Sequence, residues 1–113
     1  MKIKPFGLLA ILLAALCVAG CQTATVDVTK TAKGFHAPTN PNDLEILMTK
    51  PDRPYVELGT IAAVKFSPSD TAKMHNAIRA KAAQLGANAA ILNVVGLDAK
   101  EKQFALGVAI AWK

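Results

Sequence analysis

Cys21 is the residue of this chain whose type and position predict covalent chemistry. It follows Val18, Ala19 and Gly20, and small residues directly before a cysteine allow a signal peptidase to cut between Gly20 and Cys21. The thiol of Cys21 then carries diacylglycerol, and its new amino group carries an N-acyl lipid; such chains hold a protein on a membrane surface. We predict cleavage between Gly20 and Cys21, lipidation of Cys21, and no other cofactor.

The residues before Cys21 have the composition of a secretion signal. Lys2 and Lys4 form a basic start, and the apolar run that follows covers residues 6–19. As a helix this run would rise only about 21 Å, which is shorter than a hydrocarbon core of about 30 Å. We therefore predict a lipoprotein signal peptide over 1–20; an ordinary cleaved signal or a short membrane anchor is the alternative.

The charge that remains after cleavage is small and scattered. Removal of Lys2 and Lys4 leaves 11 basic residues against 8 acidic ones, a net charge of +3. No Lys/Arg cluster of the kind that neutralises phosphates is present, so nucleic acid is not an expected partner. Cys17 leaves with the signal and Cys21 is lipidated, so the mature chain is predicted to form no disulfide.

A segment without an apolar period separates Cys21 from the folded unit. Residues 22–42 are rich in Thr, Lys, Pro and Asn, and with Cys21 they predict a lipidated cysteine and flexible tether over 21–42. Twenty-one extended residues would reach about 70 Å at most. The alternative is that residues 25–29, where Val26 and Val28 alternate with polar residues, add an edge strand.

Residues 43–113 predict one small domain of the α+β class. Alternating apolar residues indicate strands over 43–49, 55–66, 89–95 and 104–112. Between the second and third strands, 69–85 predicts a helix that Gly86 ends. Its inner side is expected to carry Thr71, Met74, Ile78, Ala82 and Leu85. Short connections favour antiparallel neighbours. We expect a ββαββ order, with a four-stranded, mainly antiparallel sheet and one helix packed on one face.

The two faces of this sheet differ in side-chain size. On the last strand Phe104, Leu106, Val108, Ile110 and Trp112 share one side, and we expect these large side chains in the core. A solvated sheet face normally carries polar side chains, whereas the other side here is small and apolar. We predict that it is an interface, unless the tether folds over it or the small residues only fit sheet twist. The predicted interface comprises Gly59, Ile61, Ala63, Ala105, Gly107, Ala109 and Ala111.

The sequence offers no cluster that predicts a metal site or catalysis. His36 lies in the predicted tether and His75 on the flank of the predicted helix. A metal site needs several convergent ligands, and no group of Cys, His and acidic residues here has that spacing. The carboxylates are scattered over loops and faces. We therefore predict no metal and no enzymatic activity.

Two stretches of the domain resemble a group of small bacterial lipoproteins. Tyr55-Val-Glu-Leu-Gly-Thr-Ile61 is followed, after one helix, by Ala82-Ala-Gln-Leu-Gly-Ala-Asn-Ala-Ala-Ile91. This arrangement is similar to that of the outer-membrane lipoproteins that sense envelope stress for the Rcs phosphorelay, and to YbjQ-like domains. The resemblance covers residues 43–113 and implies an envelope lipoprotein with a small α/β domain. By resemblance to enterobacterial lipoproteins, Gln22 implies sorting to the outer membrane.

Together these patterns predict a non-enzymatic outer-membrane lipoprotein that faces the periplasm. Its expected partners are the membrane, through the lipid on Cys21, and an unidentified envelope protein or further copies of itself. The resemblance adds a role in envelope stress. The alternative is a periplasmic module that binds a metal, a lipid or a cell-wall fragment. An enzyme would require His75 to converge with carboxylates in a pocket.

Overall fold

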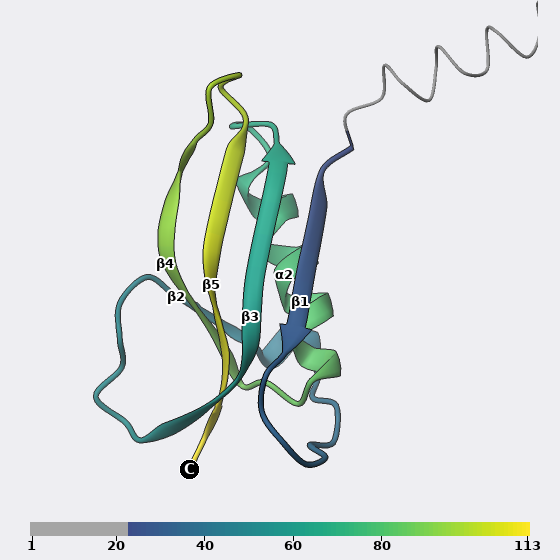
Figure 1. Cartoon of the computed structure of the whole chain (residues 1–113), viewed down its shortest axis with the longest axis vertical. Helices are drawn as coiled ribbons and strands as arrows, with labels where there is room; N and C mark the ends of the chain where they lie inside the picture. The colour runs from purple at the N-terminus through teal and green to yellow at the C-terminus, as the bar shows by residue number, and fades with distance from the viewer. Residues whose placement is uncertain (1–22) are drawn as a thin grey trace, which may run out of the picture.

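The structure, a computed structural model, describes residues 23–113. In these residues one helix crosses one face of a five-stranded sheet (Figure 1). The predicted α+β class with one helix on one face is confirmed, whereas the predicted number of four strands is wrong. The elements are β1 (Thr25–Lys30), the 3-10 helix η1 (Pro41–Asp43), β2 (Glu45–Leu47), β3 (Tyr55–Phe66), α2 (Thr71–Gln84), β4 (Ala89–Leu97) and β5 (Gln103–Trp112).

The additional strand is β1, which forms one edge of the sheet in the order β1-β3-β5-β4-β2. It runs antiparallel to β3, with Val26 opposite Ala63 and Val28 opposite Ile61. Val26 is buried, and Val28 packs partly buried against the core. Residues 25–30 are therefore part of the sheet and not of a flexible tether, because their alternating valines cover apolar surface.

The strand predicted over 43–49 does not pair with the next strand, although the short loop between them favoured an antiparallel pair. β2 lies at the other edge of the sheet and runs parallel to β4, with Glu45 opposite Ala89 and Leu47 opposite Ile91. Both sides of β3 are already hydrogen-bonded, to β1 and to β5. β2 therefore occupies the outer side of β4, and the expected antiparallel pair of the first two strands is wrong. The sheet is mixed.

Helix α2 begins two residues later than predicted and ends one residue earlier. Asp70 caps its start without a side-chain hydrogen bond, and the left-handed Gly86 (φ 89°) follows its end. Of the five residues expected on its inner side, Met74, Ile78 and Ala82 are completely buried, whereas Thr71 and Leu85 are half-buried. In residues 23–113 no helix has the length and apolar character needed to cross a membrane.

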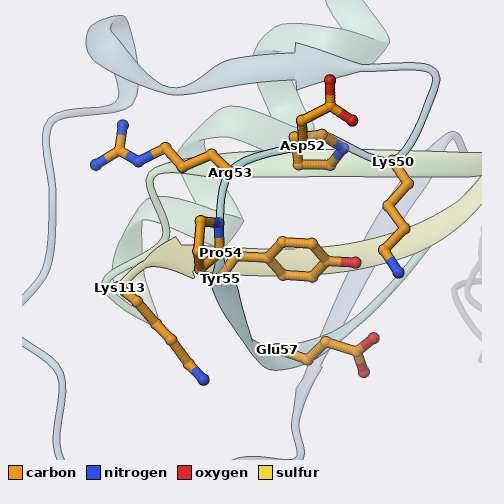
Figure 2. A pocket seen from close by; sticks show the side chains of 8 residues that line it. Lys50, Asp52, Arg53, Pro54, Tyr55, Glu57 and Lys113 are labelled. Carbon is orange, nitrogen blue, oxygen red and sulfur yellow. The ribbon is translucent and has the colours of Figure 1, made fainter.

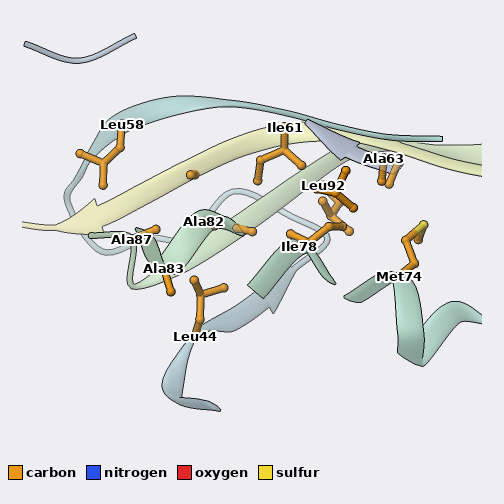
Figure 3. Packing of buried hydrophobic residues seen from close by; sticks show 14 of the residues in the cluster. Leu44, Leu58, Ile61, Ala63, Met74, Ile78, Ala82, Ala83, Ala87 and Leu92 are labelled. Atoms are coloured by element: carbon orange, nitrogen blue, oxygen red, sulfur yellow. The ribbon is translucent and has the colours of Figure 1, made fainter. Parts of the chain in front are cut away.

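The main core lies between α2 and the sheet face that carries the small residues (Figure 3). Leu58 and Ile61 of β3 and Leu92 of β4 point toward the helix from the sheet side. On the central strand β5 the corresponding positions are alanine and glycine, so the helix can approach the sheet closely. Each large side chain buried there contributes about 1.5–3 kcal/mol.

Candidate functional site

The seven residues predicted as an interface do share one sheet face, but α2 covers it. Ala63, Ala105 and Ala109 expose no surface, and Ile61 exposes 2%. Gly59, Gly107 and Ala111 are buried as well. The prediction of an interface on this face is therefore wrong. Small side chains are needed here because a helix lies on the strands, not because a partner does.

Close backbone approach explains the two glycines of this face. A Cβ atom on Gly107 would overlap the carbonyl oxygen of Ile91 on the neighbouring strand. A Cβ atom on Gly59 would overlap the carbonyl oxygen of Thr29 and lie 2.9 Å from Leu85 Cδ1. Any side chain at these positions would force the strands apart.

The uncovered side of the sheet carries large apolar residues. Leu106 of β5 lies opposite Val94 of β4 and opposite Ala62 of β3, so the three form a row across the strands. The exposed fractions are 42% for Leu106 and 49% for Val94. No helix covers this side in the part of the chain that the structure describes (Figure 1). We call it the open face, with the residues Thr60, Ala62, Val94, Phe104, Leu106 and Val108.

One end of this sheet side is packed by other described residues. Ala89, Ile91 and Ile110 form a small second cluster of buried residues there, against Trp112 among others. The guanidinium carbon of Arg53, in the loop after β2, lies 4.6 Å from the centre of the Trp112 ring. Among the large residues expected in the core, Ile110 is fully buried as predicted. Phe104, Val108 and Trp112 are half-buried, and Leu106 is exposed, contrary to prediction.

The same loop forms a pocket of about 440 Å³ (Figure 2). Tyr55 lies among two lysines, Lys50 and Lys113, and two acids, Asp52 and Glu57. Apart from the half-buried Tyr55, these side chains are exposed. Side chains of both charges therefore line this pocket in contact with water.

A second hollow follows the outer side of β1. It consists of two adjoining cavities of about 400 and 430 Å³, which share Val26, Lys81 and Gln84 among their lining residues. Helix α2 forms one wall and β1 the other. The first cavity has an apolar floor that includes Phe66 and Ala77. We call the two cavities together the edge groove.

Ionisable groups with a shifted pKa lie apart from these surfaces. Partial burial lowers the pKa of His75 below its usual 6.5, and the nearby charge of Arg79 adds to the effect. The backbone amide of Lys102, and then that of Lys100, lower the pKa of Asp98. Within residues 23–113 no three His, Cys, Asp or Glu side chains come together in a way that could hold a metal ion.

The predicted cleavage and lipidation residues, Gly20 and Cys21, lie outside the described residues. The position of β1 nevertheless limits how far the domain could stand from a membrane to which Cys21 is anchored. Thr25, the first residue of β1, is the fourth residue after Cys21, a span of about 14 Å at most. This is far shorter than the predicted tether. A lipid on Cys21 would place the start of β1 close to the bilayer.

Comparison with known proteins informs the fold. The chain matches no protein-family model and no curated protein. Its structure is similar to the crystal structure of the Francisella virulence factor FvfA, with a TM-score of 0.56 and 14% sequence identity. The match covers 77% of this chain and 97% of FvfA. At this identity the likeness concerns the fold alone.

Sequence reasoning missed both the open face and the edge groove. The alternation along β5 separates two sets of side chains correctly, but it does not say which set the helix covers. The groove depends on β1, for which the alternation of Val26 and Val28 was the available signal. That signal is short, and polar residues surround it.

Proposed function

We propose that this protein is a non-enzymatic lipoprotein of the outer membrane that faces the periplasm and associates with a second copy of itself through the open face. Diacylglycerol and an N-acyl chain on Cys21 anchor it. The observation that carries the proposal is the row formed by Ala62, Leu106 and Val94, because exposed apolar patches mark interaction sites.

A second copy suits the open face because that surface carries no charge at its centre. All six of its residues are uncharged, and Asp27 and Glu57 lie at the margins of the same sheet side. Two copies packed face to face therefore bring no like charges into contact at the centre. The contact between them would resemble the packing of two sheets in a sandwich.

The anchor is compatible with such a dimer. Two sheets packed face to face keep their strands within about 30° of each other. With the twofold axis along the strands, both β1 strands start at the same end of the dimer. Each linker from Cys21 spans about 14 Å at most, and both anchors would therefore reach one bilayer.

The anchoring part of the proposal is tested by mass spectrometry of the protein purified from membranes. We expect the mature chain to begin at Cys21 and to carry the mass of three acyl chains. The Cys21→Ser variant should lose this mass and leave the membrane fraction. An unmodified Cys21 in a chain that starts elsewhere would refute the anchor.

The association is tested by sedimentation of the full lipidated protein in detergent. We expect a dimer for the native sequence and a monomer for Leu106→Glu, because the substitution places two charges in the contact. Ala72→Glu is the matched control, since Ala72 is exposed on α2. A native protein that sediments as a monomer at all concentrations would contradict the proposal.

A further inference from the structure

The outer side of β1 offers backbone groups for another strand. Among residues 23–113, which the structure describes, β1 is an edge strand and pairs only with β3. The amide of Thr31 donates a hydrogen bond to the carbonyl of Leu58 at 3.0 Å. In antiparallel pairs, hydrogen-bonded residues alternate with residues whose backbone groups point away. The backbone N–H and C=O groups of Val26 and Val28 therefore point away from β3.

These outward groups face a hollow that has space for an extended chain. The edge groove runs between β1 and α2, and its second cavity is lined by residues 26–29 of β1 itself. Ala77 and Ala80 form part of the helix wall in the first cavity. Their small side chains leave room next to the strand. A strand that pairs with β1 would thus have its backbone on the sheet edge and alternate side chains toward the helix.

The charge of the groove selects among extended segments. Lys73 and Lys81 stand on the same side of α2 as the two alanines, two helical turns apart. Among residues 23–113, no acidic residue lines the first cavity, and Asp27 is the one acid along the second. Both lysines are exposed. A segment with acidic side chains or a terminal carboxylate complements this rim.

We propose that the edge groove binds an extended, acidic segment of another envelope protein, which adds to β1 as a sixth strand. In this mode of recognition the backbone hydrogen bonds supply affinity, and pockets for alternate side chains supply specificity. The binding mode itself is independent of self-association through the open face. It relies on the proposed function only for the location of the partner in the envelope.

A second copy of this chain fits the edge groove less well. An antiparallel pair of two β1 strands would place the two Thr25 residues at opposite ends of the pair. Strands of six residues separate these ends by about 20 Å. The short linkers to the two anchors would then reach one membrane only with the strands lying flat on it. A segment of another protein avoids this constraint, because it does not carry a second Cys21 anchor that must reach the same membrane.

The experiment uses the full lipidated protein in nanodiscs and a phage library of random nine-residue peptides with free carboxyl termini. We expect the selected peptides to be rich in β-branched and acidic residues. One selected peptide is then synthesised, and its dissociation constant is measured by fluorescence anisotropy. A selection that yields no binding peptide overturns the proposal.

Variants of the protein locate the binding. Val28→Pro removes an outward N–H while leaving the β1–β3 hydrogen bonds in place, and we expect it to weaken binding about tenfold. Val28→Ala keeps the N–H and should retain most of the affinity. The double variant Lys73→Glu, Lys81→Glu should weaken binding of the acidic peptide and strengthen binding of a version with lysines in place of its acids.

Three results would contradict the proposal after a peptide has been selected. The first is a peptide that binds Val28→Pro as well as the native protein, with thermal unfolding unchanged between them. The second is an affinity unaffected by the charge reversal. The third is crosslinking of Val28→Cys to itself in membranes, which would assign the groove to a second copy. Leu106→Glu should leave peptide binding intact, which separates this inference from the proposed self-association.

Discussion

Ala105 and Leu106 are neighbours on β5 with opposite surroundings: Ala105 is completely buried, whereas Leu106 exposes 42% of its surface. Adjacent strand residues point to opposite faces of a sheet, so this difference shows which face the helix covers. The small residues face α2, and the large ones form the open face. The small side chains on the covered face are therefore needed for α2 to pack on the sheet.

Gly107→Ala should destabilise the protein by about 1–3 kcal/mol or more, because the new Cβ atom overlaps the backbone of Ile91 on β4. The free energy of unfolding in urea measures this effect. Gly96→Ala on β4 is the control and should cost less, because its new Cβ atom would lie 3.4 Å from the Phe104 ring, an ordinary van der Waals contact. A Gly107→Ala protein as stable as the native one would contradict the packing described for this face.

Ile78→Ala should destabilise the protein by about 2–5 kcal/mol, because it leaves a cavity where α2 meets the sheet. Ile78 is completely buried. Lys73→Ala, on an exposed position of the same helix, controls for helix propensity and should have little effect. Urea unfolding of both variants checks the prediction. Equal losses in the two proteins would contradict the orientation of α2.

His75 should make stability fall as the pH decreases below about 6.5. Burial, and then the charge of Arg79, keep the pKa of His75 in the folded state below its ordinary value. Between 6.5 and that lower pKa the unfolded chain binds a proton that the folded one does not, so acid favours unfolding. His75→Gln should show a flatter pH dependence in urea unfolding. Parallel curves for both proteins would contradict the prediction.

Asp98→Ala should lower the melting temperature by a few degrees and loosen the turn between β4 and β5. The Asp98 carboxylate accepts hydrogen bonds from the amides of Lys100 (2.8 Å) and Lys102 (2.9 Å). These bonds lower its pKa, so their contribution is present above pH 3.8 and is lost as the pH falls through the folded-state pKa. Amide exchange at Lys100 and Lys102 checks the turn directly, and Asp98→Asn should be milder because its amide oxygen can still accept. Unchanged exchange in Asp98→Ala would contradict this role.

The helix and the long strands could be predicted from the sequence because their patterns are local. Met74, Ile78 and Ala82 recur at helical spacing, and Gly86 has the left-handed conformation that ends the helix. The alternation of β5 also separated its two sets of side chains correctly. These features depend on residues close together in the chain.

The sheet order and the covered face could not be predicted in the same way. β1 pairs with residues 29 to 39 positions away, with Thr29 opposite Thr60. This pairing takes the side of β3 that β2 was expected to use. The choice of the covered face depends on how closely a helix can approach. The buried alanines of β5, Ala105 and Ala109, leave the room that this approach needs. The open face was missed for this reason.

Crosslinking through a single cysteine tests the proposed self-association most directly. The mature chain is expected to have one cysteine, which is lipidated, so Leu106→Cys adds one free thiol in the open face, and Ala72→Cys adds one on the exposed side of α2. Both full-length proteins are treated in intact membranes with a short bis-maleimide linker. The proposed dimer predicts strong crosslinking of Leu106→Cys and little of Ala72→Cys. No crosslinked dimer for Leu106→Cys, or equal amounts for both proteins, would contradict it.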